Sequence, residues 1–170
     1  MRTVHLLRHA KSSWDDATLP DHDRPLAPRG LRAAAAMRDH AAATGLQVDL
    51  VLVSSARRAQ QTWESVAPGV VVGEVRTEGA IYGATATELL RLVHGVDDEL
   101  RSVLLVGHDP GFHDLASSLA GAGDHEALTA LRDKYPTGAL ASLTFDGEWS
   151  SIGSGDGRLV SFVRPRDLER

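Results

Sequence analysis

The segment TVHLLRHAKS, residues 3–12, organises the fold that this sequence predicts. Its apolar residues up to Leu7 are typical of a short buried strand, and the apolar run stops abruptly at Arg8 and His9. In open α/β sheets, ligands bind just outside the carboxyl ends of the strands. A guanidinium and an imidazole at such an end suit an anionic substrate and a nucleophile, although a strand can also end in ordinary solvated side chains.

The length and composition predict a single globular domain over residues 1–170. Hydrophobic residues make up 42% of the chain and charged residues 24%, a balance that argues against disorder. The formal net charge of -5 disfavours binding to nucleic acid or to an anionic membrane, so individual arginines would have to hold any anionic ligand. The chain has no cysteine, which excludes disulfides, thiolate metal sites and a cysteine nucleophile. Because no secretory signal and no membrane-spanning run is recognisable, we expect a cytoplasmic protein.

Apolar runs of strand length alternate with helical patterns along most of the chain. Strands are predicted at residues 4–7, 49–53, 70–75, 102–106, 139–145, 149–152 and 159–163, and helices at residues 30–44, 56–66, 85–93, 110–120 and 125–132. Asp109 is a suitable N-cap for the fourth of these helices, with Pro110 at its first position. The alternation indicates a three-layer α/β/α fold with a mostly parallel central sheet, to which the C-terminal strands could add an antiparallel edge strand.

Polar residues follow three of the predicted strands at the point where each strand ends. The first strand ends at Arg8 and His9, the second leads through two serines to Arg58, and the fourth ends at His108. Since parallel strands place their carboxyl ends along one edge of the sheet, these side chains can meet there. Arg donates hydrogen bonds in a planar fork that matches phosphate oxygens, and the N-termini of the following helices add further donors. The sequence therefore predicts a site for a phosphoryl group.

The two histidines at the strand ends suit different roles. A nucleophilic imidazole must be neutral, and neighbouring guanidiniums disfavour its protonated form. His9, which is next to Arg8, fits the nucleophile, and His108 could donate to the phosphoryl oxygens. Taken singly, each residue also has a structural explanation, because a histidine at a strand end can hydrogen-bond a turn and Arg57 or Arg58 can be a surface cation.

The segment at residues 13–28 is predicted to be a long polar loop, and a loop of that length in a compact domain often has a function. His22 lies in this loop and could touch a substrate. His9, His108 and Asp109 do not form a recognised metal-ligand spacing, so no metal site is expected.

Four stretches of the chain, in order and between residues 3 and 115, resemble the signatures of the histidine phosphatase superfamily, also called phosphoglycerate-mutase-like. They are Leu7-Arg8-His9-Ala10, similar to the Arg-His-Gly signature; Arg24-Pro25-Leu26 with Gly30, similar to a loop of the family; Ser54 through Thr62, similar to a Ser-x-x-x-Arg-Ala-x-Gln-Thr segment; and Val106-Gly107-His108, similar to the second histidine motif. One motif would be weak evidence, whereas four in order are specific.

This resemblance implies an α/β/α fold and a catalytic site without metal or cofactor. It implies that His9 becomes transiently phosphorylated and that Arg8, Arg58 and His108 bind the phosphoryl group. Ser12, which follows the first motif, is a further candidate for binding phosphate.

Within the superfamily, the small size, the run RHAKSSW from Arg8 and the residues that follow His108 look like the SixA type, the phosphohistidine phosphatases. Two residues depart from the mutase branch. That branch has an asparagine where Asp15 falls, and its catalytic glutamate falls on Gly79, with Glu78 one residue away. A general acid is therefore missing unless Glu78 supplies it, which argues against mutase activity.

We interpret the chain as a phosphatase that works through a phosphohistidine intermediate and acts on phosphohistidine in proteins. One alternative is a phosphatase for a small phosphorylated metabolite, and another is a non-catalytic module that binds a phosphorylated ligand. The presence of His9 favours catalysis, because a binding module needs no neutral nucleophile. No nucleic-acid or membrane partner is expected, and the sequence leaves the oligomeric state open.

Overall fold

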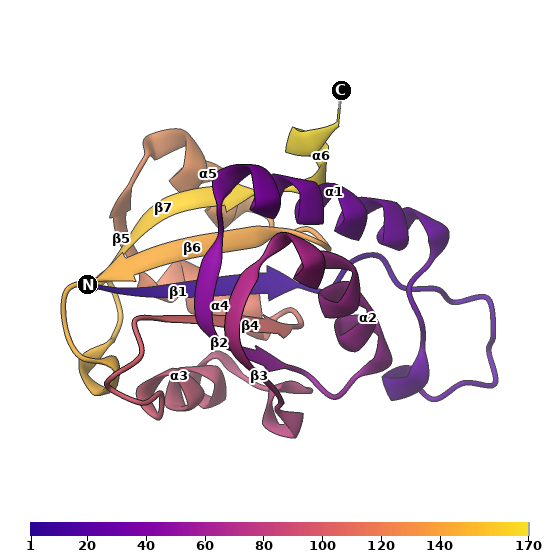
Figure 1. Cartoon of the computed structure of the whole chain (residues 1–170), viewed down its shortest axis with the longest axis horizontal. Coiled ribbons are helices and arrows are strands. Elements are labelled where there is room, and N and C mark those ends of the chain that lie inside the picture. The colour runs from indigo at the N-terminus through magenta and orange to yellow at the C-terminus, as the bar shows by residue number, and fades with distance from the viewer. Residues whose placement is uncertain (170) are drawn as a thin grey trace.

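The structure is a computed structural model that describes residues 1–169, and a seven-stranded sheet runs through its centre (Figure 1). The strands are β1 (Arg2–Arg8), β2 (Gln47–Val53), β3 (Val71–Thr77), β4 (Ser102–Gly107), β5 (Ala120–Gly123), β6 (Leu140–Phe145) and β7 (Gly157–Val163), in the order β3-β2-β4-β1-β6-β7-β5. β6 pairs antiparallel with both of its neighbours, and the other pairs are parallel. The structure confirms the predicted mostly parallel sheet with an antiparallel strand contributed by the C-terminal part of the chain. This strand is β6, which lies between β1 and β7.

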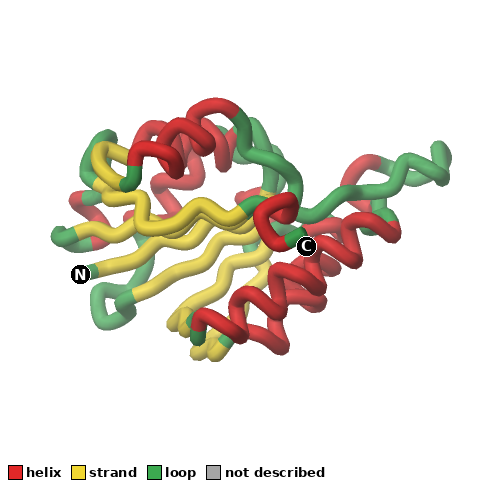
Figure 2. The backbone as a smooth tube through the Cα atoms, turned by 90° about the horizontal axis from the view of Figure 1, so that it is seen from above, coloured by secondary structure: helices red, strands yellow, loops and turns green. Residues whose placement is uncertain are grey.

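Helices cover both faces of the sheet, which confirms the three layers (Figure 2). α1 (Pro28–Thr44) and α2 (Arg57–Val66) pack on one face, and α3 (Ala86–His94), α4 (Gly111–Leu119) and α5 (His125–Asp133) pack on the other. The short helix α6 (Pro165–Leu168) lies against α1, and four 3-10 turns complete the fold: η1 (Asp21–Asp23), η2 (Ala67–Gly69), η3 (Gly79–Ile81) and η4 (Trp149–Ser151). Over residues 1–169, no helix is long and apolar enough to cross a membrane.

The central strands are apolar on both faces because each face is covered. In β1, Leu6 belongs to the hydrophobic cluster with α3, α4 and α5, whereas the next residue, Leu7, belongs to the cluster with α1 and α2. Successive side chains of a strand point to opposite faces, so a strand between two helical layers needs an unbroken apolar run. The unbroken apolar run at the start of the chain is explained by this burial of β1 on both faces.

The segment after β1 packs closely against the start of α1. The carbonyl of Lys11 accepts a hydrogen bond from the backbone N–H of Ala27 at 2.9 Å. A Cβ at Gly30 would lie 2.1 Å from that same oxygen, so only glycine fits at this position. This contact fixes α1 relative to the end of β1.

Two predicted local features are wrong, and one strand is not predicted. Pro110, rather than Asp109, occupies the N-cap of α4, and the Asp109 carboxylate instead accepts from the backbone N–H of His113. The predicted strand at residues 149–152 is the 3-10 turn η4, because the indole of Trp149 is buried and donates to the carbonyl of Leu100. The glycine-rich segment after the predicted helix at 110–120, for which no strand is predicted, forms β5, whose pairing with β7 outweighs the low strand propensity of glycine and alanine.

His5 makes the stability of the fold dependent on pH. Its imidazole is buried in β1 with Nδ1 2.7 Å from the hydroxyl of Ser142, and burial lowers the pKa of His5 from 6.5 to about 4. Below pH 6.5 the unfolded chain binds a proton at His5 that the folded chain does not bind until about pH 4. The contribution of the neutral His5 to the free energy of unfolding is therefore fully present above pH 6.5. It is lost as the pH falls to about 4, and the total loss is up to about 3 kcal/mol.

Urea denaturation over this pH range tests the prediction. The variant His5→Gln cannot titrate, so its free energy of unfolding should decline less steeply with falling pH than that of the wild type. Equal slopes for the two proteins would contradict the prediction.

Candidate active site

The register of the parallel strands brings three strand ends together. Arg8 in β1 stands opposite Gly107 in β4, and Val53 in β2 stands opposite Val106. The ladder continues beyond the strands, because the backbone N–H of His9 donates to the carbonyl of Gly107 at 2.9 Å and that of Ser54 donates to the carbonyl of Val106 at 3.0 Å. The polar residues that follow β1, β2 and β4 therefore lie side by side, as predicted.

The imidazoles of His9 and His108 lie next to each other, with their ring centroids 5.2 Å apart and their planes at 51°. Nδ1 of His9 donates to the carbonyl of Ala10 at 2.7 Å, which leaves the lone pair of the neutral ring on Nε2. Nε2 of His108 lies 2.7 Å from the hydroxyl of Ser54, which also accepts from the backbone N–H of Ala56. The Ser54 hydroxyl can then donate its own hydrogen to Nε2, and in that tautomer the neutral His108 ring carries its proton on Nδ1.

Both imidazoles are held in the neutral form. Burial lowers the pKa of His9 to about 3, and the positive charges of Arg58 and Arg8 act in the same direction. Burial also lowers the pKa of His108 to about 4, with Arg58 as the next cause. At neutral pH, His9 therefore presents an unprotonated nitrogen.

Arg58 and Arg8 flank the imidazoles, as the strand-end pattern predicts. Arg58, in the first turn of α2, is buried and donates to Asp21 twice, from Nη1 to the carbonyl at 2.8 Å and from Nη2 to the carboxylate at 3.1 Å. Arg8 donates from Nη1 to the carbonyl of Tyr135 at 2.8 Å, and the same nitrogen lies 3.5 Å from the carboxylate of Asp109.

Unpaired donors gather at this site. Within residues 1–169, four buried side-chain polar atoms lack a hydrogen-bond partner, and three of them are Nε of Arg8, Nε of Arg58 and Nδ1 of His108. Buried polar atoms without partners are rare in folded proteins and call for an explanation. Three such nitrogens on residues next to a neutral imidazole are candidates for donating to a bound oxyanion.

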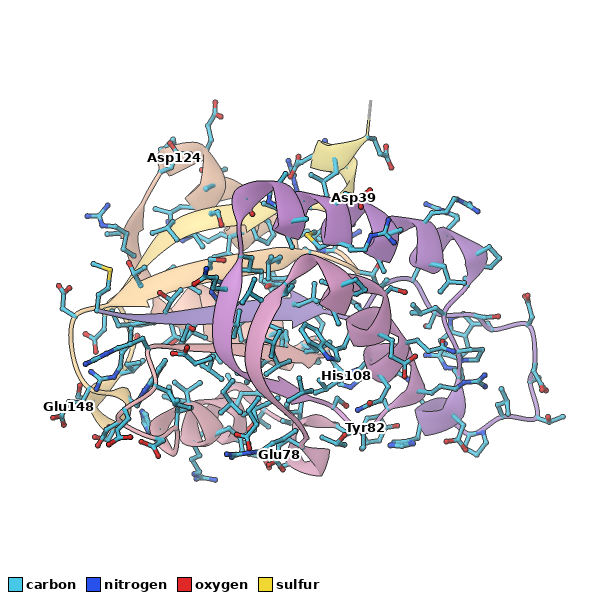
Figure 3. The ribbon with its side chains drawn as sticks, viewed as in Figure 1. Asp39, Glu78, Tyr82, His108, Asp124 and Glu148 are labelled. Carbon is cyan, nitrogen blue, oxygen red and sulfur yellow. The ribbon has the colours of Figure 1, made fainter. Side chains whose placement is uncertain are left out.

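Sequence reasoning missed Asp21 and Tyr82, which close one side of the site. The Asp21 carboxylate accepts from Arg58, from Arg24 and from the hydroxyl of Tyr82 at 2.6 Å. The hydrogen bond from Tyr82, together with the two arginines, lowers the pKa of Asp21 to about 2. The Tyr82 ring also lies against His108, with the centroids 5.5 Å apart (Figure 3). The signal for Asp21 in the sequence was the length of the loop at 13–28, which carries it.

His22 also lies at this edge of the site. Its Nε2 is 2.9 Å from the hydroxyl of Ser55, and its ring meets the edge of Tyr82 with centroids 4.8 Å apart. The loop at 13–28 therefore borders the site, as its length suggested.

Ser12 and Glu78 have other contacts. The hydroxyl of Ser12 accepts from Nη1 of Arg24 at 2.9 Å and so supports the loop. The carboxylate of Glu78 caps η3 by accepting from the backbone N–H of Ala80, and Glu78 lines a different hollow with Arg76 and Arg91. Neither contact involves His9 or His108. Apart from its chain neighbours, a Cβ on Gly79 would meet no atom within 4 Å, so the space beside Gly79 is open.

Comparison with known proteins places these features in a family. The family model for the histidine phosphatase superfamily (branch 1) matches residues 4–80, which contain β1, β2 and α2. A structure from Nakamurella multipartitia assigned to the phosphohistidine phosphatase SixA has 30% sequence identity and a TM-score of 0.84, with 96% of each chain covered. The protein histidine phosphatase SixA complexed with tungstate has 25% identity and a TM-score of 0.73, covering 98% of this chain and 99% of the other. An uncharacterized protein from Mycobacterium tuberculosis is 38% identical over 162 residues, which are 94% of this chain and all of the relative.

The adjacent arginines 57 and 58 provide a matched test of anion binding. Arg58 is buried beside the imidazoles, whereas Arg57 is exposed. Arg58→Lys should weaken the binding of inorganic phosphate by about tenfold or more, because an ammonium cannot reproduce the planar fork. Arg57→Lys should leave the affinity within about twofold. Isothermal titration calorimetry measures both; equal losses would mean that Arg58 does not hold the anion.

Proposed function

The chain belongs to the histidine phosphatase superfamily and is a phosphatase of SixA type, and on this premise we propose that it hydrolyses phosphohistidine in proteins, with His9 as the nucleophile. The proposal is carried by one observation, the neutral His9 imidazole surrounded by unpaired donors on Arg8, Arg58 and His108. The tungstate in the similar SixA structure supports it, because tungstate is a tetrahedral oxyanion with the shape of a phosphoryl group.

The reaction proceeds in two displacements, which divide one difficult step into two easier ones. Nε2 of His9 attacks phosphorus, and a new phosphorus–nitrogen bond forms while the bond from phosphorus to the leaving group breaks. The guanidiniums of Arg8 and Arg58 and Nδ1 of His108 donate to the phosphoryl oxygens and stabilise their charge. Water then attacks the phosphorylated His9, which releases inorganic phosphate, returns the lone pair to Nε2 and passes a proton to solvent.

The leaving group decides which substrates such a site can cleave. An alkoxide leaving group needs a proton in the transition state, and a positioned acid typically contributes about 10²–10⁴-fold. Gly79 stands where the mutase branch has its acid, and Glu78 is engaged in capping η3. The Asp21 carboxyl, with its lowered pKa, is ionised at neutral pH and is no donor. A phosphohistidine requires less help, because its imidazole leaves as a neutral group once the ring is protonated by solvent.

His9→Ala should lower the turnover of an aryl phosphate by about 10³-fold or more, because the covalent step is lost. Circular dichroism should show an unchanged fold. Rapid quenching of the wild type in alkaline denaturant should trap phosphate on His9, found by peptide mass spectrometry. His125→Ala, at an exposed histidine in α5, is the control and should keep wild-type turnover. Appreciable turnover by His9→Ala would overturn the mechanism.

The absence of an acid predicts a strong dependence on the leaving group. The kcat/KM values for phosphohistidine and aryl phosphates should exceed those for phosphoserine and glycerol phosphates by about 10²-fold or more. A series of substrates with graded leaving-group pKa, measured on the wild type and on Glu78→Gln, provides the test. A steep dependence in both proteins is expected. A flat dependence in the wild type that becomes steep in Glu78→Gln would identify Glu78 as the acid, and a preference for alkyl phosphates would favour a small phosphorylated metabolite as substrate.

A further inference from the structure

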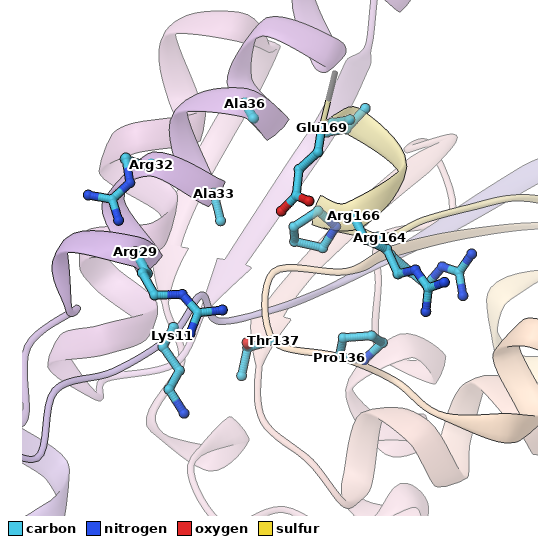
Figure 4. A pocket seen from close by; sticks show the side chains of 12 residues that line it. Lys11, Arg29, Arg32, Ala33, Ala36, Pro136, Thr137, Arg164, Arg166 and Glu169 are labelled. Carbon is cyan, nitrogen blue, oxygen red and sulfur yellow. The ribbon is translucent and has the colours of Figure 1, made fainter.

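A groove of about 500 Å³ lies between α1, α6 and the loop at residues 136–138 (Figure 4). We call it the basic groove because five cations line it: Lys11, Arg29, Arg32, Arg164 and Arg166. Its remaining lining is small or apolar apart from Thr137 and one carboxylate, that of Glu169. None of these cations takes part in the candidate active site described above.

Most of the positive charge in the basic groove is uncompensated. Arg164 is paired with Asp167 at 2.9 Å. Within residues 1–169, the other four cations form no ion pair, and they face the single carboxylate of Glu169. The whole chain has a net charge of -5, so the groove is a local reversal of the protein's overall charge. Such a patch attracts an acidic partner that the rest of the surface repels.

The basic groove adjoins the site at His9. Lys11 follows His9 by two residues, which places the two Cα atoms within about 7 Å of each other. The backbone N–H of Gly138, in the loop that lines the groove, donates to the carbonyls of Arg8 at 3.1 Å and His9 at 2.9 Å. A Cβ on Gly138 would lie 2.9 Å from Pro165, so this backbone is packed between the end of β1 and the start of α6. A chain phosphorylated at the active site can therefore reach the groove within a few residues.

The cations are spread along the groove and do not converge on one point. Figure 4 shows Arg29 and Arg32 extending from α1 on one side, Lys11 below them, and Arg164 and Arg166 across the hollow. The groove is also lined by apolar residues, which we call its apolar floor: Ala33, Ala36, Pro136, Pro165 and Leu168. A small anion would need donors around a single position, whereas spaced charges above an apolar floor suit an extended polypeptide with several carboxylates.

We propose that the basic groove binds an acidic segment of the phosphorylated protein substrate, next to its phosphorylated residue. The inference rests on the proposed function and extends it, because it names the chemistry of the substrate outside the phosphoryl group. Complementary charge mainly raises the rate of association and so lowers KM. Hydrolysis of a small aryl phosphate, which does not reach the groove, is independent of it.

Matched peptides test the groove. In the first pair, phosphohistidine is flanked by glutamates in the acidic peptide and by glutamines in the neutral peptide. The second pair has phosphotyrosine in place of phosphohistidine, with the same flanking residues. The groove variant, Arg29→Glu with Arg166→Glu, changes one residue on each wall. The control, Arg91→Glu with Arg158→Glu, makes the same charge change at exposed arginines in α3 and β7, outside the groove.

The wild type and the control should hydrolyse the acidic peptide with a kcat/KM about tenfold above that of the neutral peptide, mainly through KM. The groove variant should reduce this ratio to within about twofold while keeping wild-type turnover of p-nitrophenyl phosphate. About 0.5 M NaCl should abolish the preference in the wild type, because it screens exposed charges.

Several results would overturn the inference: equal rates for acidic and neutral peptides in the wild type, a preference that survives in the groove variant, or an equal loss in the control. A loss of p-nitrophenyl phosphate turnover in the groove variant would also overturn it, because the groove would then act on the reaction centre. If neither phosphohistidine peptide is hydrolysed but the phosphotyrosine peptides are, the substrate proposed above fails. The acidic-to-neutral ratio of the phosphotyrosine pair still decides the role of the groove.

Discussion

The register between β1 and β4 is the constraint on which the candidate active site depends. Arg8 stands opposite Gly107, and the ladder continues to the backbone N–H of His9, which places His9 beside His108. A slip by one residue would turn every side chain of β1 to the opposite face. Leu6 and Leu7 pack into hydrophobic clusters on different sides of the sheet, so such a slip would misplace both of them. The two cores therefore hold the two imidazoles at 5.2 Å.

Burial at this edge has opposite consequences for the imidazoles and the guanidiniums. The histidines lose their protons, because burial and neighbouring cations disfavour the charged ring. The arginines stay charged, and Arg58 is compensated by Asp21 from the loop. Some donors remain unpaired, namely Nε of both site arginines and Nδ1 of His108. The site thus combines an uncharged imidazole with a preformed set of donors, and preorganised donors need little rearrangement when charge develops on an oxyanion.

The two flanks of the site differ in chemistry. On one flank, the loop with Asp21 meets Tyr82 and carries a negative charge close to the guanidinium of Arg58. On the other flank, the chain leads from His9 through Lys11 into a groove lined by cations. The charge of Asp21 is balanced by Arg24 and Arg58, whereas most cations of the basic groove are unpaired. The charge pattern would therefore direct an acidic segment of the proposed substrate along the second flank.

The sequence by itself indicated the layers of the fold and the four residues Arg8, His9, Arg58 and His108, which the structure brings together in the candidate site. The apolar run before Arg8 and His9, and the similar run before His108, predict buried parallel strands whose polar ends meet, because that inference needs only local patterns and one rule of sheet geometry. Tertiary structure alone decided the rest. Asp21 and Tyr82 meet although 61 positions separate them, Trp149 packs in a turn instead of a strand, and the basic groove joins α1 to a helix at the far end of the chain. The physical reason is that these contacts are set by how helices and loops pack across the completed sheet, and no local pattern of apolar or charged residues encodes that packing.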